Sequence, residues 1–406
     1  MDLAPHLRFS NYLGRRAHLG VCGSVAAYKT LDILRGLLKC NASVSATLTA
    51  SAQQFVTPLT FEALGAAPVY AGMYPVGIDT FGHLEPAQNA DALLVAPASA
   101  NTLAKLANGL ADDMLSCQAL AFQGPVVLAP AMNTRMWQAP ATQENWARLM
   151  GRGCIGVLPG SGAMACGEEG QGRLAEPLDI LFATLRAMTK QDMAGKKVLV
   201  NLGPTREPWD AVRYLSNASS GTMGGAVAVA AWLRGAEVTV VAGPVNLWLP
   251  AAISRQCVTT AQEMFTACTD LWPGMDMACL TAAVADYRPK PYGERKFKKA
   301  SAEAGLNIEL MPNPDILKAL GANKRIGQAL IGFAAESHDL EAHARAKLQA
   351  KNLDLIVANS IVGESGAFDS PVNAVTVIGS DGRLETWPSL PKPEVAWRIW
   401  DIVSNP

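Results

Sequence analysis

Residues 196–225 constrain the fold more than any other part of this sequence. The stretch begins with the apolar run 198–200, passes through a Gly-Pro turn at 203–204 and a polar loop, and ends in a helix of small residues at 225–230. A strand, a glycine-bearing polar loop and a helix in this order are typical of the first unit of a nucleotide-binding α/β domain. The free N–H groups of such a loop and the positive end of the helix suit an anion. Because this unit starts near residue 197, the sequence predicts that a complete domain precedes it.

Chain length and charge narrow the classes of protein that the sequence can encode. A chain of 406 residues is too long for one ordinary core and suits two domains of about 200 residues each. With 34 basic and 35 acidic residues the net charge is −1, so no basic excess indicates a nucleic-acid partner. No apolar run is long enough to span a membrane, and the eight cysteines form no CxxC pair. We therefore expect a cytoplasmic protein with buried thiols that binds small molecules.

The first half of the sequence alternates apolar strands with helices. The expected strands are 18–21, 43–49, 91–96, 125–129 and 154–158, and the expected helices are 26–38, 50–55 and 103–108. Continuous apolar strands of this kind predict a parallel sheet that is covered on both faces. Polar residues follow the strand ends, where open α/β sheets bind ligands. The turn at 20–24 and the loop at 98–102 could hold a phosphorylated cofactor, whereas no acidic residue about 20 positions further on supports NAD.

Three loop residues of the first half stand out as chemically capable. His83 is by default a solvated loop histidine, but histidine is also the side chain that most often carries protons near neutral pH. Asn133 lies in a loop rich in methionine and tryptophan, which either packs back on the core or forms a flap that carries the amide to a carboxylate. Cys166 lies in the glycine-dense stretch 160–173, which we expect to be mobile and hinge-like, and a thiol there is a better reactive candidate than a core thiol.

The second half predicts another parallel sheet of the Rossmann type, with lysines near its polar edge. Its expected strands are 197–202, 237–242, 278–283, 330–334 and 353–358. Lys296, Lys298 and Lys299 follow Asp286 in a loop, and Lys347 and Lys351 share one helix face because they are four residues apart. Each pair alone is more typical of a solvated surface. Together they suit a nucleoside triphosphate, usually with Mg²⁺.

Several motifs resemble one enzyme family when they are taken together. GVCGSVAAYK, the His83 loop, APASANT, PAMNTRMW and MACGEEGQGR resemble the FMN-containing cysteine decarboxylases, which have a flavodoxin-like fold. GPTREPWDAVRYLSNASSGTMG and AAVADYRP, followed by ERKFKK, resemble phosphopantothenoylcysteine synthetase. In this order, over roughly residues 17–404, the chain is similar to the bacterial bifunctional phosphopantothenoylcysteine synthetase/decarboxylases of coenzyme A biosynthesis.

For the first half, the resemblance implies an FMN-dependent decarboxylation of 4′-phosphopantothenoylcysteine to 4′-phosphopantetheine. His83 would be the base near the flavin, Asn133 would hold the substrate carboxylate, and Cys166 would donate a proton when the enethiol intermediate is reduced. The positions that match flavin-contacting loops are Ser24, Thr49, Ser99 and Asn101. The first loop departs from the usual Ser-Gly-Gly and reads Cys22-Gly23-Ser24, so that its hydroxyl comes one residue later.

For the second half, the resemblance implies ligation of 4′-phosphopantothenate to cysteine through an acyl-cytidylate formed with CTP. Arg213 and Asn217 match positions that handle this intermediate, and the Asn217 amide could hydrogen-bond a developing oxyanion without adding charge. The positions that match CTP contacts are Ala282, Asp286, Lys296, Pro312, Asn313, Phe333, Lys347 and Lys351. Mg²⁺ is implied as a cofactor, with ligands that the sequence does not identify.

The domain organisation follows from the same reasoning. We expect a loose N-terminal extension at 1–16, a decarboxylase domain at 17–186, a linker at 187–196 and a ligase domain at 197–406. The resemblance also implies a homo-oligomer, a dodecamer, because flavin sites in this fold family are often completed at subunit contacts. No nucleic-acid or membrane partner is expected.

Two other functions remain open from the residues alone. Two Rossmann units could form a nicotinamide oxidoreductase, although a full GxGxxG with its acidic partner is missing. A flavodoxin-like chain could also be a regulatory binding subunit. Such a subunit would be expected to lose catalytic positions, whereas His83, Asn133 and Cys166 are all present.

Overall fold

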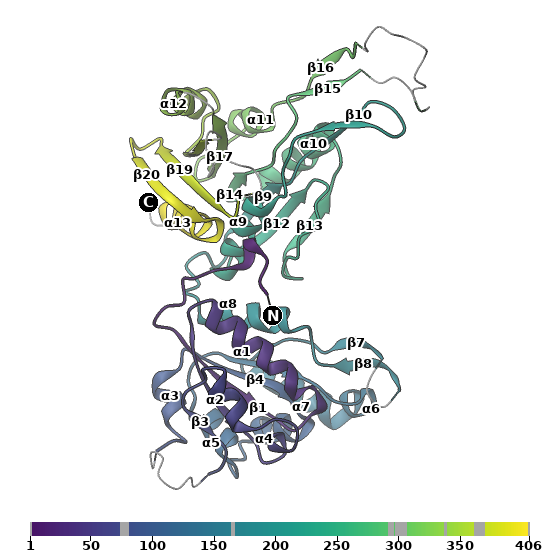
Figure 1. Cartoon of the computed structure of the whole chain (residues 1–406), viewed down its shortest axis with the longest axis vertical. Helices are drawn as coiled ribbons and strands as arrows, with labels where there is room; N and C mark the ends of the chain where they lie inside the picture. The colour runs from purple at the N-terminus through teal and green to yellow at the C-terminus, as the bar shows by residue number, and fades with distance from the viewer. Residues whose placement is uncertain are drawn as a thin grey trace. The chain divides into compact units, whose positions relative to one another are not determined.

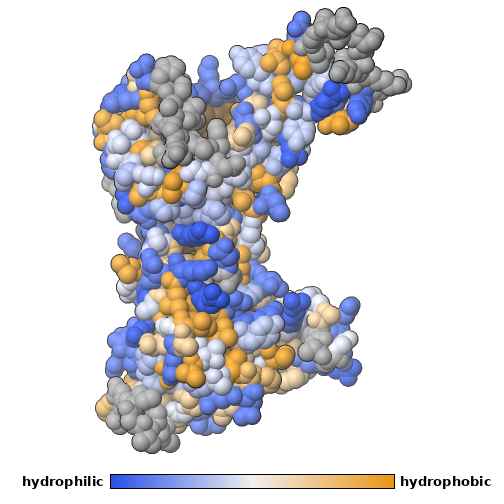
Figure 2. Space-filling view, viewed as in Figure 1, coloured by the Kyte–Doolittle hydropathy of each residue, from blue (hydrophilic) through white to orange (hydrophobic). Residues whose placement is uncertain are grey.

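A computed structural model describes residues 2–73, 81–163, 167–290, 296, 307–336, 339–360 and 370–404, with the backbone alone at 335, 336 and 360. The chain divides into two compact units (Figure 1): unit 1 is Met1–Leu3 with Phe9–Lys190, and unit 2 is Ala4–Arg8 with Gln191–Pro406. Within the described residues, no helix has the length and apolar character needed to cross a membrane. Figure 2 shows hydrophilic and hydrophobic residues interspersed over the visible face.

The core of unit 1 is a six-stranded sheet in the order β3-β2-β1-β4-β5-β6, and every described pairing in it is parallel. Its strands are β1 (Arg16–Val21), β2 (Ser43–Leu48), β3 (Val69–Tyr70), β4 (Ala92–Ala98), β5 (Val126–Pro130) and β6 (Ile155–Gly156). Apart from the two-residue edge strand β3, this is the flavodoxin order 2-1-3-4-5. All seven residues of β4 are buried, as expected of a strand covered on both faces. The parallel-sheet prediction for this half is confirmed.

The helices of unit 1 follow their strands, with local caps that fix where they begin. They are η2 (Val25–Lys29), α1 (Thr30–Lys39), η3 (Ala52–Gln54), α2 (Pro58–Ala63), α3 (Glu85–Asn89), α4 (Ala100–Asn108), α5 (Met114–Ala121), α6 (Thr134–Gln138), α7 (Pro140–Gly151) and α8 (Pro177–Met188). Ser99 caps α4, and Asp113 with Ser116 forms a capping box on α5. The helix expected at 26–38 is a 3-10 turn followed by an α-helix, and the one expected at 50–55 is only the 3-10 turn η3.

The glycine-dense stretch that we expected to be a mobile loop instead forms an antiparallel hairpin, β7 (Gly160–Ala163) with β8 (Glu169–Arg173). Its glycines are needed for backbone shape and close approach. Gly172 has a φ of +155°, and a Cβ at this position would lie 2.3 Å from the Met132 carbonyl oxygen. The hairpin therefore packs directly on the loop after β5. Cys166, the predicted reactive thiol of this stretch, lies outside the described residues.

Unit 2 contains an eight-stranded sheet in the order β13-β12-β9-β14-β17-β18-β19-β20. Its strands are β9 (Lys197–Leu202), β12 (Glu237–Ala242), β13 (Ser254–Cys257), β14 (Met277–Leu280), β17 (Ala329–Glu336), β18 (Leu355–Ser360), β19 (Val372–Gly379) and β20 (Leu384–Pro391). The first six are parallel and follow the Rossmann order 3-2-1-4-5-6. The prediction missed β19 and β20, which are antiparallel. Only residues 380–383 join these two strands, and so short a turn can connect only antiparallel strands.

Helix α9 (Thr222–Leu233) is the central helix of unit 2. Ten of its twelve residues are buried, since it contacts β9 on one side and helix α13 (Lys392–Ser404) on another. Its small residues allow this close packing, because a Cβ on Gly224 would lie 2.4 Å from the Leu202 Cβ. The other helices of unit 2 are η1 (Pro5–Leu7), α10 (Ala261–Leu271), η4 (Trp272–Gly274), α11 (Ile316–Ala322) and α12 (Leu340–Ala350).

Two small hairpins lie outside the main sheet of unit 2. One is β10 (Arg206–Pro208) with β11 (Tyr214–Ser216), in the stretch that we expected to be only a charged loop. The other is β15 (Tyr287–Pro289) with β16 (Leu310–Pro312). Both follow strands that end at the polar edge of the sheet, so they extend the loops there.

The N-terminal segment is not the loose extension that the sequence suggested. Leu3, Leu7, Phe9 and Tyr12 are each at most 2% exposed. The Tyr12 hydroxyl lies 2.8 Å from the Thr189 hydroxyl inside unit 1. Four large side chains of this segment are therefore buried. Their spacing in the sequence matches neither a helix nor a strand, so the sequence pattern did not predict their burial.

Candidate functional site

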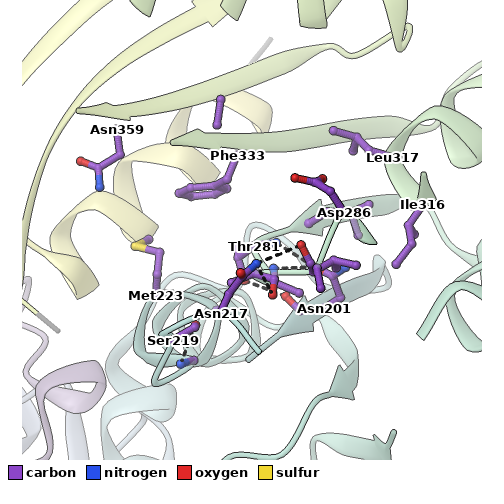
Figure 3. Close-up of a pocket in the computed structure, with 18 of the residues that line it drawn as sticks. Asn201, Asn217, Ser219, Met223, Thr281, Asp286, Ile316, Leu317, Phe333 and Asn359 are labelled. Carbon is purple, nitrogen blue, oxygen red and sulfur yellow. Dashed lines mark hydrogen bonds between the residues drawn. The ribbon is translucent and has the colours of Figure 1, made fainter. Parts of the chain in front are cut away.

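A cavity of about 520 Å³ in unit 2 lies where the strand order reverses between β9 and β14 (Figure 3). Its walls come from the first turn of α9, the loop after β14, the start of α11, and residues of β17, β18, β19, α12 and α13. Ligands of open α/β sheets bind at such a switch point, outside the carboxyl ends of the strands. Its volume is within the usual range for a small-molecule site.

Asn201, at the end of β9, fixes the loop that forms the floor of the cavity. It is 2% exposed, and its Oδ1 accepts hydrogen bonds from the backbone N–H groups of Thr281 at 2.8 Å and Ala282 at 3.0 Å. The Thr281 hydroxyl donates in turn to the Asn201 carbonyl at 2.6 Å, and these bonds are visible in Figure 3. Sequence reasoning missed this residue, although an asparagine inside an apolar strand was a usable signal.

Three further side chains hold the rest of the same loop. The Thr205 hydroxyl accepts the Ala285 N–H at 3.1 Å, and the Asn313 side-chain amide donates to the Ala285 carbonyl at 2.8 Å. The Asn217 amide donates to the Val284 carbonyl at 3.1 Å. The loop is thus held by side-chain hydrogen bonds, so its shape is set before any ligand arrives.

Most of the predicted nucleotide positions meet at this cavity. The predicted residues that line it are Asn217, Ala282, Asp286, Asn313, Phe333, Lys347 and Lys351. Arg213, Lys296 and Pro312 are not among its lining residues. Lys296 is exposed, and Pro312 belongs to β16, where its carbonyl accepts a hydrogen bond from Arg288 at 2.8 Å. Lys298 and Lys299 lie outside the described residues.

Arg213 is held at the end of the β10–β11 hairpin. Its guanidinium forms an ion pair with the buried Asp210 at 3.1 Å and lies 4.8 Å from the centre of the Trp209 ring. Asp210 also accepts the N–H groups of Val212 and Arg213. These contacts orient the arginine although 44% of its side chain is exposed.

Both predicted helix lysines line the cavity. Lys351, just after α12, forms an ion pair with Asp315 at 2.9 Å, and Lys347 lies one turn earlier. Partial burial opposes ionisation of Asp315, but hydrogen bonds from the Lys318 N–H and from Lys351 outweigh it and lower its pKa. Asp315 therefore stays charged near neutral pH and partly neutralises Lys351.

In unit 1, small hydroxyl residues begin three successive loops at the carboxyl edge of the sheet. The hydroxyl oxygens of Ser24, Thr49 and Ser99 each accept a backbone N–H two or three residues later, at 3.2 Å. Asn101 lies in the first turn of α4, after the Ser99 cap. Hydroxyls and N–H groups at helix starts suit a phosphate, so these predicted residues occupy chemically suitable places.

The first loop of unit 1 lies against both of its neighbours. A Cβ on Gly23 would lie 2.5 Å from the Ser51 Cβ, so this position permits only glycine while the second loop stays in place. Cys22 Sγ lies 3.1 Å from the Thr102 hydroxyl of α4. The loops after β1, β2 and β4 therefore form one continuous cradle, which fits a phosphorylated cofactor.

Asn133, after β5, already holds a carboxylate. Its Oδ1 caps α6 by accepting the Arg135 N–H at 2.8 Å, while its Nδ2 donates to Glu168 at 2.7 Å. Arg135 forms an ion pair with the other Glu168 oxygen at 2.9 Å. Trp137 packs on Trp146 with ring centres 5.4 Å apart, so the loop both packs on the core and presents an amide to a carboxylate.

The loop that carries His83 is held from below by a buried polar network. The Gln118 side chain donates to the Gly82 carbonyl at 3.0 Å and accepts a hydrogen bond from Thr47 at 2.6 Å. Thr47 lies 2.9 Å from His18, whose complete burial lowers its pKa to about 3 and keeps it neutral. Sequence reasoning missed Gln118, because an isolated glutamine in a helix carries no signal.

The described residues contain no group of three His, Cys, Asp or Glu side chains that could hold a metal ion. Among the cysteines, burial raises the pKa of Cys40 and Cys268 to about 12 and also raises the pKa of Cys279. These thiols are packing residues, as expected from their apolar surroundings.

Unit 1 has a parallel sheet, unit 2 has a mainly parallel one, and each has polar loops gathered at a switch point. These features are typical of α/β proteins that bind nucleotides or flavin nucleotides. Residues 9–189 match the family model "Flavoprotein", and residues 193–405 match "DNA/pantothenate metabolism flavoprotein C-terminal domain". The chain is 40% identical over 372 residues to the coenzyme A biosynthesis bifunctional protein CoaBC of Vibrio parahaemolyticus, covering 91% of this chain and 93% of that one. It is also 40% identical to the Bacillus subtilis protein of the same name, covering 95% of both chains.

The chain therefore belongs to the family of coenzyme A biosynthesis bifunctional proteins. A crystal structure of the C-terminal domain of such a protein covers 53% of this chain and 97% of its own length, with 40% identity and a TM-score of 0.45. Members of the family are phosphopantothenoylcysteine synthetases and decarboxylases, and this chain is a bifunctional enzyme of that pathway. This replaces the two alternatives, the nicotinamide oxidoreductase and the regulatory subunit.

Proposed function

We propose that the cavity of unit 2 ligates 4′-phosphopantothenate to cysteine at the expense of CTP, through an acyl-cytidylate. The observation that carries this proposal is the cavity itself, which lies at the switch point and brings together Asn217, Asp286 and Lys347 from three distant segments. Lys347 and the positive end of α9 supply positive potential for a polyphosphate. Phe333 offers an aromatic surface against which a base can stack.

Asn217 is proposed to stabilise the oxyanion that develops when the acyl carbon is attacked. Its amide is neutral and is oriented by the carbonyls of Ala283 and Val284 at 3.3 and 3.1 Å. Arg213, which lies on the hairpin outside the cavity lining, is proposed to reach the intermediate's anionic groups from there. Its contacts with Asp210 and Trp209 hold the guanidinium in one place.

The remaining nucleotide assignments are extensions of the same proposal. Ala282, Asp286 and Asn313 are proposed to contact CTP directly in the cavity, together with Lys351. Lys296 and Pro312, outside the cavity lining, are proposed to approach the nucleotide only when it is bound. Mg²⁺ is proposed to arrive with the triphosphate, because such ions are held by one or two carboxylates plus phosphates, and Asp286 and Asp315 line the cavity.

We propose that unit 1 decarboxylates the product of this ligation with FMN. When bound, FMN would supply reversible hydride chemistry. Ser24, Thr49, Ser99 and Asn101 are proposed to hold it, supported by the cradle of loops at the carboxyl edge.

The other residues of unit 1 are proposed to act on the substrate. Asn133 would bind the substrate carboxylate in place of Glu168, with which its Nδ2 now forms a 2.7 Å hydrogen bond. His83 would act as the base, and Cys166 as a proton donor. The Gln118 bond to the His83 loop would keep the imidazole in position.

The domain assignment and the assembly are also proposals. Residues 17–186 would form the decarboxylase domain and 197–406 the ligase domain, which is supported by the division of the chain between Lys190 and Gln191, within the predicted linker 187–196. A homo-oligomer, a dodecamer, and a cytoplasmic location are proposed from the family.

The test is a measurement of two separate activities on the purified full chain. The protein should carry FMN absorbance, and pyrophosphate release should require phosphopantothenate and CTP. Carbon dioxide release should follow only when cysteine is added as well. A folded protein that binds no FMN, or that releases no pyrophosphate with CTP, would contradict the corresponding half of the proposal.

A further inference from the structure

One end of the unit 2 cavity contains polar residues to which the proposed nucleotide chemistry gives no role. Asn359 lies on β18, Asn373 on β19, and Lys392 begins α13 directly after β20. Figure 3 draws Asn359 and Met223 on one side of the cavity, across from Ile316 and Leu317. The subsite formed by Asn359, Asn373, Lys392 and Met223 is called the amide–lysine subsite below.

The strand register places these side chains next to one another. Asn359 pairs with Val375, which is two residues from Asn373 and so on the same side of β19 apart from a local bulge. Pro391 pairs with Val372, and Lys392 follows it. Two amide side chains from the neighbouring strands β18 and β19, and a lysine at the start of α13, therefore line the same end of the cavity.

The polar side chains of this subsite are largely buried, so their hydrogen-bonding groups need partners. Lys392 is 4% exposed and Asn373 is 6% exposed. The Oδ1 atom of Asn359 is buried and has no hydrogen-bond partner among the described residues. Asn373 Nδ2 lies 3.7 Å from the Met223 sulfur, which ties β19 to the first turn of α9. A buried acceptor without a donor costs free energy, so a ligand that supplies a donor is favoured here.

We propose that the amide–lysine subsite binds the amino-acid substrate, cysteine, during ligation, which rests on the ligase function proposed above. The Lys392 ammonium would pair with the cysteine carboxylate. Asn359 Oδ1 would accept a hydrogen bond from the cysteine amino group. The Met223 thioether offers a soft, polarizable contact for the thiol.

A zwitterion fits this subsite better than the nucleotide's phosphates do. A polyphosphate presents only acceptor oxygens, which would face the orphaned Asn359 oxygen without a proton between them. An α-amino acid presents donors on its amino group and acceptors on its carboxylate. The subsite likewise combines an acceptor, Asn359 Oδ1, with a cation, Lys392.

The subsite also suits the reaction, because Asn217 lines the same cavity. The bound ammonium loses one proton to solvent, and the amine nitrogen then attacks the acyl carbon of the acyl-cytidylate. A C–N bond forms, the C–O bond to CMP breaks with its electron pair leaving on CMP, and a second proton goes to solvent. No oxidant or reductant is involved.

The test compares Lys392→Met with Lys392→Arg and with Lys318→Met, which removes an exposed lysine of α11. The first measurement is the pre-steady-state release of pyrophosphate with CTP and phosphopantothenate, before cysteine is added. The second is the ratio of kcat/KM for cysteine to kcat/KM for cysteamine, which lacks the carboxylate. Lys392→Met should lower this ratio about 10- to 100-fold, the loss expected for a charge-assisted bond, and leave the pyrophosphate step unchanged. Lys392→Arg should restore most of the ratio, and Lys318→Met should match the wild type.

Other outcomes overturn the proposal in distinguishable ways. If Lys392→Met slows pyrophosphate release or raises the KM for CTP, Lys392 serves the nucleotide instead. If the wild type does not prefer cysteine to cysteamine, no cation of the enzyme binds the cysteine carboxylate, and the proposal is wrong. This measurement needs only the wild type, so it decides the question even when the variants fail to fold. If the wild type releases no pyrophosphate at all, the ligase proposal fails first.

Discussion

Replacing Asn201 with leucine tests whether one buried amide sets the shape of the unit 2 cavity, in which CTP is proposed to bind. The change keeps a side chain of similar size but removes the oxygen that accepts the N–H groups of Thr281 at 2.8 Å and Ala282 at 3.0 Å. The loop then has two backbone donors without their partner, directly at the cavity floor. Ala282 is one of the residues proposed to contact CTP.

The expected magnitude follows from these two bonds. A neutral hydrogen bond contributes about 0.5–1.5 kcal/mol net, so the loss of two bonds corresponds to about 1–3 kcal/mol. If the loop must be reordered when CTP binds, this free energy appears as a rise in the dissociation constant of about 5- to 150-fold, since about 1.4 kcal/mol is a factor of ten. Decarboxylation in unit 1 should not change.

The assay is calorimetric titration of CTP into wild type, Asn201→Leu and Asn201→Asp, together with decarboxylation of supplied phosphopantothenoylcysteine. The aspartate variant keeps acceptor oxygens at the same place and should bind CTP more tightly than the leucine variant. Unchanged CTP affinity in a folded Asn201→Leu protein would refute the view that this amide organises the loop.

Three more predictions concern other parts of the chain. His83→Asn should abolish carbon dioxide release while pyrophosphate release continues, and a folded variant that lost both activities would contradict the assignment of separate sites. Burial lowers the pKa of His18 to about 3 in the folded chain, below its unfolded value near 6.5. The stabilising contribution of neutral His18 is therefore complete above pH 6.5 and is lost as the pH falls towards 3. The urea midpoint of His18→Gln should depend less on pH in this window than that of the wild type, and an equal pH dependence would contradict the neutral, buried state of His18. Leu7→Ala should destabilise unit 2 by about 2–5 kcal/mol in denaturant unfolding, because Leu7 is 1% exposed, whereas a change near zero would restore the idea of a loose extension.

The sequence predicted the parallel sheets because their strands are apolar runs that end in glycine- or proline-bearing turns. Residues 198–200 and 278–280 are such runs, and they lie in β9 and β14 on either side of the cavity. Lys347 and Lys351, which the sequence predicts on one helix face, both line the cavity, although Lys351 follows the last residue of α12. Periodicity and turn chemistry are local signals, so a single sequence suffices to detect them.

Long-range contacts could not be predicted in the same way. Asn201 and Gln118 act through partners 80 and 36 residues away, and neither partner is marked by its neighbours in the sequence. The hairpin β7–β8 was hidden because its glycines also suit a mobile loop, and only its packing against Met132 shows why they are needed. The burial of Leu7 and Tyr12 likewise depends on tertiary partners.

The central claim, that one chain carries two independent sites, is tested most directly by mixing two inactivated variants. His83→Asn should retain ligation and Asn217→Asp should retain decarboxylation, so each alone should convert phosphopantothenate, cysteine and CTP to phosphopantetheine slowly or not at all. Mass spectrometry of an equimolar mixture should show phosphopantetheine formation restored, because the intermediate made by one variant is consumed by the other. A mixture of folded variants that forms no more product than either alone would contradict the account.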